Sequence, residues 1–278
     1  MSQVIATIDW VVQHRSADRS VDIVAPDVSP ISLRVPGGSS TPTSRPGNIG
    51  GHRSGRLRDV ACRAVARMSP TARREAIVDA ALSVAIRKGF GSTTVRDVSS
   101  ELGCSSGLIH HYFDSMDEVL AAAFEVAAGR DLDVTSTAVA AEPTPRAQLM
   151  AFFASYARTD QDWSSQLWLD AWAEAARQPA LGATSRRLNV AWQQLLAQII
   201  ERGVAAAEFR CDDPDGAAWR IVSMIDGLAI QNVAHGPMLP EHAILDWTLT
   251  TTEHELDLPH GALPRPGSVD SATTSATT

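Results

Sequence analysis

The sequence predicts an all-α fold, in which an N-terminal three-helix domain with a helix-turn-helix precedes a larger helical domain. From residue 70 onward, apolar residues recur every three or four positions, which is the spacing of one helix face. The expected helices start at Ser, Thr or Pro and stop at Gly or before Pro. No stretch alternates apolar and polar residues as a half-buried strand would. With 278 residues, the chain can form two modest domains with loose ends.

The two ends of the chain lack this helical pattern. Residues 1–68 include VPGGSSTPTSRPGNIGG, whose Gly, Pro, Ser and Thr cannot bury enough apolar surface to offset the entropy of ordering. We expect 1–68 to be disordered, or to be an extension absent from a native protein that starts at Met68. N-terminal sequencing that finds upstream residues would contradict the second expectation. We expect 258–278 to be a disordered tail.

The first three helices are predicted by their caps. Ser69-Pro70 starts a helix over Pro70–Lys88, and Gly89 stops it. Thr94, with Asp97 three residues later, starts a helix over Val95–Leu102. Gly103 ends that helix, and Ser105 starts a short one that runs through about Tyr112. These helices form a domain over 69–116.

The later helices form a second domain over 117–257. Ser115, with Glu118 three residues later, caps the first of them. Breaks at the prolines then separate five predicted helices: Arg146–Ala157, Trp163–Arg177, Gly182–Phe209, Pro214–Ala234 and Pro240–Glu255.

Charge is segregated along the chain. Residues 45–96 hold eleven Lys and Arg against three Asp and Glu, so they carry +8 in a chain whose net charge is −8. A basic segment joined to an acidic body indicates a DNA-facing end. The alternative is a basic tail without a partner.

The composition also narrows the class of protein. Three distant cysteines, Cys62, Cys104 and Cys211, indicate neither a disulfide framework nor a zinc site, and they fit a reducing cytoplasm. The chain has no apolar run long enough for a membrane span and no secretory signal pattern, so we expect a cytoplasmic protein. We expect no cofactor and no metal.

The stretch GCSSGLIHHYF is the turn and second helix of the predicted helix-turn-helix. Ser105, Ser106 and Gly107 make a small polar surface that fits a DNA groove. His110 and His111 are adjacent, so they point about 100° apart on a helix and do not readily share one metal. A metal site, a catalytic site and a solvated surface remain the alternatives to a DNA contact.

Residues Arg73 to Phe124 resemble the DNA-binding domain of TetR-family transcriptional regulators. The matching run is IVDAALSVAIRKGFGSTTVRDVSSELGCSSGLIHHYFDSMDEVL. The later pieces WLDAWAEAARQPAL, RRLNVAWQQLLAQIIERGVAAAEF and IDGLAI resemble, more loosely, the C-terminal domain of the betaine-regulator (BetI-like) branch. The resemblance implies a regulator, most typically a ligand-responsive repressor, that binds a palindromic operator as a homodimer. It also implies that the second domain binds ligand and dimerises.

The resemblance also implies roles for single residues. Thr93, Thr94 and Arg96 would contact phosphates, and Ser105, Ser106 and Gly107 would approach base edges. His110, at a position where the family usually has an aromatic residue, would lie near the DNA backbone with His111 and Tyr112, and Phe113 would pack between helices. Met116 departs from the family, which usually carries a phosphate-binding Lys there, and this removes about one ionic contact.

Aromatic residues in the second domain predict a pocket for a small-molecule inducer. Trp168 and Trp172 share a helix face, and Phe152 and Tyr156 lie on the preceding helix. The betaine-type resemblance implies a cationic ligand over aromatic faces, with Asp226, Asp170 or Glu174 as a countercharge. The alternative is that these aromatic residues are core.

The helices over 214–234 and 240–255 suit a twofold dimer interface, although they could instead complete the core of one chain. Two other classes of protein remain open: a helical enzyme or carrier with a helix-turn-helix, and a redox sensor that uses Cys104. No acid–base or nucleophile arrangement favours an enzyme. The operator, the target genes, the inducer and the choice between repression and activation do not follow from the sequence.

Overall fold

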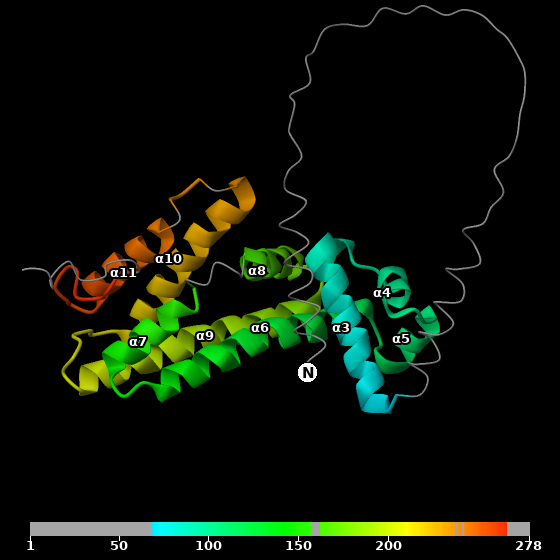
Figure 1. Cartoon of the computed structure of the whole chain (residues 1–278), viewed down its shortest axis with the longest axis horizontal. Helices are drawn as coiled ribbons and strands as arrows, with labels where there is room; N and C mark the ends of the chain where they lie inside the picture. Colours follow the sequence, from blue (N-terminus) through cyan, green and yellow to red (C-terminus); the bar gives the residue numbers. More distant parts are fainter. Residues whose placement is uncertain (1–67, 157–161, 237, 241, 266–278) are drawn as a thin grey trace, which may run out of the picture.

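The computed structural model describes residues 68–156, 162–236, 238–240 and 242–265, and within these ranges it contains helices and no strand (Figure 1). The all-α prediction is confirmed. The elements are α3 (Pro70–Lys88), the 3₁₀ turn η1 (Phe90–Ser92), α4 (Val95–Leu102), α5 (Ser106–Tyr112), α6 (Met116–Ala141), α7 (Pro145–Ala154), α8 (Asp162–Glu174), α9 (Pro179–Ala205), α10 (Pro214–His235) and α11 (Ala243–Glu255).

The caps predicted from the sequence fix the N-terminal helices. The Ser69 hydroxyl accepts a hydrogen bond from the N–H of Ala72. Thr94 and Asp97 form a reciprocal capping box at the start of α4. Gly103 ends α4 in the left-handed region, at φ 68° and ψ 28°, where a side chain would be strained. The chain therefore turns sharply between α4 and α5.

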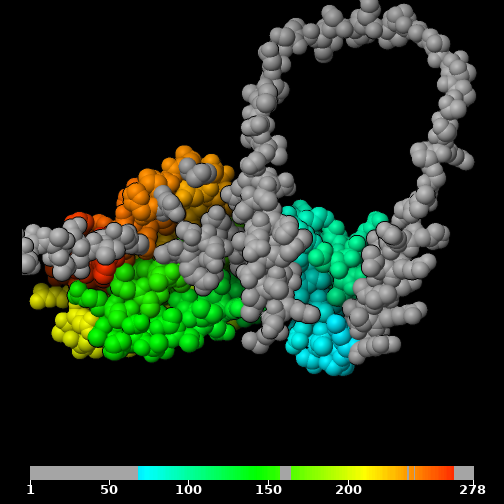
Figure 2. Space-filling model, viewed as in Figure 1, coloured from blue at the N-terminus to red at the C-terminus, as the bar shows by residue number. Residues whose placement is uncertain are grey.

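The helix α6 joins the N-terminal lobe (α3 to α5) to the body (α7 to α11), as Figure 1 shows; in Figure 2 the lobe is the cyan surface and the body the green-to-red one. Its first half packs against α3, where Leu120 and Phe124 are buried with Ile77 and Phe90. Further along, α6 lies beside α9 and α7. The predicted boundary between residues 116 and 117 thus falls at a helix start, but one buried cluster continues across it into α8 and α9. The two domains are therefore packed together rather than separated by a linker.

The helix α9 begins earlier and ends earlier than the predicted Gly182–Phe209. Its start is extended to Pro179 because the carboxylate of Asp117 on α6 accepts hydrogen bonds from the N–H groups of Ala180 and Leu181, at 2.8 and 2.9 Å. At the other end the chain reverses at Ala207, whose φ is 57°. The other predicted helices lie within a few residues of α7, α8, α10 and α11.

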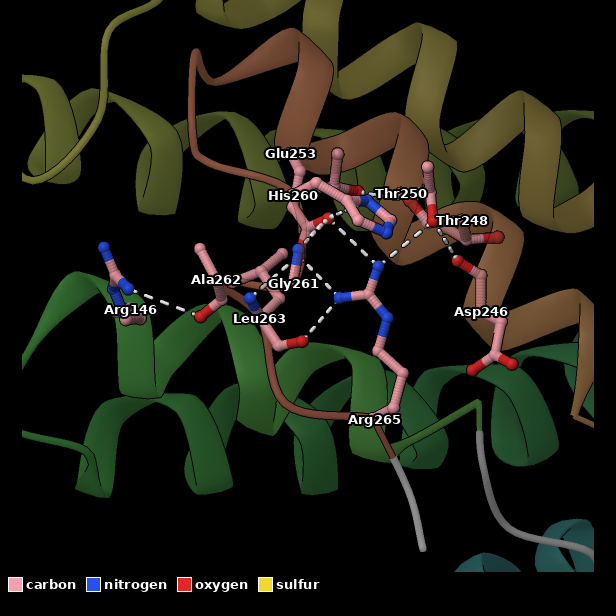
Figure 3. Close-up of polar contacts among 11 residues, drawn as sticks. Arg146, Asp246, Thr248, Thr250, Glu253, His260, Gly261, Ala262, Leu263 and Arg265 are labelled. Atoms are coloured by element: carbon pink, nitrogen blue, oxygen red, sulfur yellow. Dashed lines mark hydrogen bonds and ion pairs between the residues drawn. The ribbon is translucent and has the colours of Figure 1, made fainter. Parts of the chain in front are cut away.

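The prediction of a disordered tail after residue 258 is wrong for residues 258–265, which pack against the body (Figure 3). We call them the C-terminal strap. Leu263 is fully buried, and its N–H and that of Gly261 donate to the buried carboxylate of Glu253 on α11. The guanidinium of Arg265 binds the same carboxylate at 2.5 Å, and Arg146 of α7 donates to the carbonyl of Ala262. Residues 1–67 and 266–278 lie outside the described ranges, so the expectations for them are untested.

Candidate nucleic-acid interface and ligand site

The helix α5 presents a small, polar, exposed surface. Ser105, Ser106, Gly107, His110 and His111 are all exposed. The opposite side of α5 is held inside the N-terminal lobe by Ile109, and Phe113 just after the helix is also buried. We call these five exposed residues the α5 surface.

The side chain of Ser105 does not cap α5. Ser105 stands at the N-cap position, as the sequence predicts, but its hydroxyl makes no capping hydrogen bond. The turn is held instead by the backbone, where the N–H of Cys104 donates to the carbonyl of Ser99 at 3.0 Å. The hydroxyl of Ser105 is therefore available to an external partner.

The structure separates the two neighbouring threonines. Thr93 is buried, and its hydroxyl donates to the carbonyl of Gly89 at 2.8 Å. This differs from the expectation that the Thr93 hydroxyl holds a phosphate, because the side chain faces the turn after α3. Thr94 is exposed at the start of α4, where its hydroxyl binds Asp97.

An ion pair shapes the charge around α4. Lys88, at the end of α3, binds the carboxylate of Asp97 at 2.7 Å. Hydrogen bonds from Lys88 and Thr94 lower the pKa of Asp97 to about 2. Arg96, the next residue toward the helix start, is exposed, with no ion pair recorded in the described part of the chain. Arg96 therefore presents a positive charge on the exposed side of α4.

Two arginines of α3 hold the end of α5, a role that was not predicted from the sequence. Arg73 donates to the hydroxyl of Tyr112 at 3.3 Å, and Arg74 lies over the ring of Phe113, 4.7 Å from its centroid. His111 meets Tyr112 edge to face at 5.1 Å. Tyr112 is half-buried and oriented by these contacts. The basic run at the start of α3 was the available signal.

The predicted pocket residues fall into two aromatic groups. Phe152 and Tyr156 lie together with Trp192 of α9, at centroid distances of 5.7 and 5.8 Å from Phe152. Trp168 and Trp172 of α8 lie 5.5 Å apart, and Trp168 also meets Phe124 of α6.

Trp168 links the two aromatic groups, because it packs against both buried clusters of the protein. Trp192 was missing from the predicted pocket. Its inward position follows from the stripe that it shares with Leu188 and Leu196 on α9.

Of the three carboxylates predicted as countercharges, two are engaged by neighbours. Asp170 accepts from Gln166 at 2.8 Å, and Glu174 pairs with Arg177 at 2.7 Å. Asp226 on α10 lies close enough to Tyr156 for its charge to act on the phenol. Burial, and then the charge of Asp226, raise the pKa of Tyr156 well above its usual range.

The burial of Asp226 raises the pKa of its carboxyl to about 7. Tyr156 links Asp226 to Phe152 and Trp192, and we call these four residues the Asp226 cluster.

The described ranges hold neither a metal-binding cluster nor a membrane-spanning helix. Across the described ranges, no three His, Cys, Asp or Glu side chains gather as ligands for a metal ion. The helices in those ranges also include none that is both long and apolar enough to cross a bilayer.

Comparisons with known proteins identify the family. Residues 77–123 match the family model of bacterial regulatory proteins of the tetR family, and residues 145–257 match that of the BetI-type transcriptional repressor C-terminal domain. The HTH-type transcriptional regulator BetI of Rhizobium meliloti (strain 1021) is 32% identical over 175 residues, which cover 62% of this chain and 84% of that protein.

Two solved structures share the fold. A crystal structure from Pseudomonas aeruginosa PAO1 aligns with a TM-score of 0.60 at 23% identity, over 68% of this chain and 93% of that one. A crystal structure from Saccharomonospora viridis in complex with choline aligns with a TM-score of 0.59 at 24% identity, over 67% and 98%. The chain belongs to the TetR family of DNA-binding transcriptional regulators and carries a C-terminal domain of the BetI type.

Proposed function

We propose that this chain is a ligand-responsive repressor that reads its operator with the α5 surface. The observation that carries the proposal is the exposure of Ser105, Ser106 and Gly107 on a helix whose other side is anchored by Ile109. Small side chains let the backbone approach base edges in the major groove. His110, His111 and Arg96 would contact the sugar–phosphate backbone beside them, with Thr94 at the start of α4. The family is generally non-enzymatic, and binding rather than catalysis is the proposed activity.

The proposed repressor acts as a homodimer through α10 and α11. Trp247 on α11 is 46% exposed and Met238, between the two helices, is 67% exposed. Ser223 and Gly227 leave the outer side of α10 small, so a second copy could approach closely. A twofold dimer carries two α5 surfaces and would bind a palindromic operator.

The proposed ligand is a small organic cation. Aromatic faces attract cations, and a desolvated carboxylate supplies a countercharge. The Asp226 cluster offers both, and α8 adds Trp168 and Trp172. The related Saccharomonospora viridis structure was solved with choline, which is a cation of this kind. Choline is therefore the first ligand to test.

The experiment that tests the DNA proposal is an anisotropy titration of the full chain against DNA from upstream of its own gene and a shuffled control. We expect Ser106→Ala to lose the preference for the upstream DNA, with about 1–3 kcal/mol of discrimination removed. Ser100→Ala is the matched control, because Ser100 is an exposed serine on α4 outside the α5 surface. Equal effects of the two substitutions would contradict the proposal.

A further inference from the structure

The carboxylate of Asp226 is partly buried, and no counter-charge lies beside it in the described part of the chain. It lies on α10 beside Val222 and Ile225, which are both in the core of the body. Within the described part of the chain, no hydrogen bond or ion pair to this carboxylate is found. A carboxyl group removed from water without a partner favours its neutral, protonated form. Burial accordingly raises its pKa to about 7.

Several of the charged groups on the helices around α10 are engaged with other residues. Tyr156, just after α7, is the titratable group that interacts with Asp226, and it stays neutral because its pKa is raised well above the usual range. On α8, Asp170 binds Gln166 and Glu174 binds Arg177. On α9, Arg187 binds Glu125 and Arg202 binds Gln148. Arg220 of α10 binds Glu255 of α11, and Glu253 of α11 binds Arg265. Burial alone accounts for the shift at Asp226.

A second observation in the same cluster points to a missing ligand. The indole N–H of Trp192 is buried and has no acceptor in the described part of the chain. Trp192 is 8% exposed, and its ring meets both Phe152 and Tyr156 at 5.8 Å. A buried donor without an acceptor destabilises the empty site, and a ligand oxygen would supply the missing acceptor. The cluster therefore combines cation-attracting ring faces with an unsatisfied donor and an unpaired acid.

We propose that cation binding at the Asp226 cluster releases the proton of Asp226, so that ligand sensing is coupled to pH. This inference rests on the ligand response proposed above. In the empty site, Asp226 carries a proton below about pH 7, and the site is then neutral. When a cation enters, that proton leaves to the solvent and the carboxylate pairs with the cation. No covalent bond other than the O–H bond changes.

The sign of the pH dependence follows from this exchange. A cation binds the deprotonated form, so its affinity rises with pH through the range around 7. Between pH 6 and pH 8 the deprotonated fraction of a group with a pKa near 7 rises about tenfold, and the affinity for the cation should rise about tenfold with it. An uncharged ligand of the same shape gains no such advantage.

The test is calorimetric titration of the full chain with choline at pH 6, 7 and 8, in two buffers that differ in ionisation enthalpy. We expect an affinity about tenfold higher at pH 8 than at pH 6, and release of about half a proton at pH 7. Asp226→Asn should bind choline more weakly, with no pH dependence and no proton release. Asp212→Asn, at an exposed aspartate before α10, is the matched control. The uncharged analogue 3,3-dimethylbutan-1-ol should show no rise in affinity with pH.

The outcomes separate this inference from the proposed function. Choline binding with equal affinity at pH 6 and pH 8 and no proton release would overturn the proton coupling while leaving a ligand-responsive regulator intact. The same pH dependence in Asp226→Asn as in the natural chain would also overturn it, because another group would then be titrating. Absence of choline binding at every pH would overturn both the coupling and the ligand class.

Discussion

The indole of Trp168 on α8 meets the ring of Phe124 on α6 edge to face, with 4.9 Å between their centroids. Phe124 in turn meets Phe90 of η1 edge to face at 5.9 Å. Because η1 leads directly into Thr94 and α4, three rings in contact connect the aromatic residues of the body to the helix-turn-helix. A ligand that shifts Trp168 would therefore displace groups that pack under the proposed DNA-binding surface.

The first prediction concerns this connection. Trp168→Leu removes the ring contact with Phe124 and should reduce the effect of choline on operator affinity by about 0.5–2 kcal/mol. Operator affinity without choline should change little, because Trp168 lies outside the α5 surface. The measurement is operator titration with and without choline. Trp168→Phe keeps an aromatic edge and should restore part of the effect, whereas identical behaviour of the two variants would argue against the ring contact.

The second prediction concerns Arg96. If Arg96 contacts a phosphate, Arg96→Ala should weaken binding to operator and shuffled DNA alike and lower the slope of log affinity against log salt by about 1. The slope is measured by anisotropy across a series of salt concentrations. Arg186→Ala, at an exposed arginine on α9, should leave the slope unchanged. An unchanged slope in Arg96→Ala would remove Arg96 from the interface.

The third prediction concerns the C-terminal strap (Figure 3). Arg265→Ala removes the guanidinium that binds the buried carboxylate of Glu253 and should lower the free energy of unfolding by on the order of 3 kcal/mol. Denaturant titration at neutral pH measures it. Arg210→Ala is the control, because its pair with Asp257 spans 3.7 Å between side chains that are 87% and 70% exposed, and it should cost under about 0.5 kcal/mol. Equal losses of unfolding free energy in Arg265→Ala and Arg210→Ala would mean that the strap does not stabilise the body.

The same contact predicts a dependence on acid. Burial by itself would raise the pKa of Glu253, but hydrogen bonds from Arg265, Leu263 and Gly261 outweigh burial and lower the pKa to about 2. A lowered carboxyl pKa adds stability above the unfolded value of about 4.5, and that stability is lost as the pH falls toward 2. The natural chain should therefore lose stability more steeply than Arg265→Ala over this interval. Parallel curves for the two proteins would contradict the assignment.

The fourth prediction concerns assembly. Trp247→Glu replaces an exposed aromatic side chain of α11 with a charge and should convert a dimer into a monomer, as measured by light scattering after size-exclusion chromatography. Val126→Glu is the matched control, because Val126 on α6 is 41% exposed and Trp247 is 46% exposed. The control should remain dimeric. A dimer that survives Trp247→Glu would place the interface elsewhere.

The features predicted correctly from sequence are those set by local chemistry. Gly103 ends α4 because the turn needs a left-handed residue, and Thr94 starts α4 because its side chain can cap free N–H groups. Such signals act within four residues, so a sequence read in order contains them. The exposure of Ser106 follows equally from Ile109, which takes the buried side of α5.

The features missed from sequence depend on contacts between distant segments. Thr93 turns inward because Gly89 offers it a carbonyl, although Thr93 and Thr94 look alike in sequence. Leu263 is ordered because Glu253, ten residues earlier, accepts its N–H. Trp192 joins Phe152 only through the packing of α9 on α7. The composition of the segment after residue 258 predicted a disordered tail, because it contains no sign of the contact with Glu253.

The central claim is that ligand binding in the body and operator binding at the α5 surface are thermodynamically coupled. The most direct test measures the affinity of the full chain for its operator with and without saturating choline at pH 8, where the cation should bind best. The account predicts that choline weakens operator binding by about 5- to 150-fold, and that operator weakens choline binding by the same factor. Choline that binds the protein without changing its operator affinity would contradict the account.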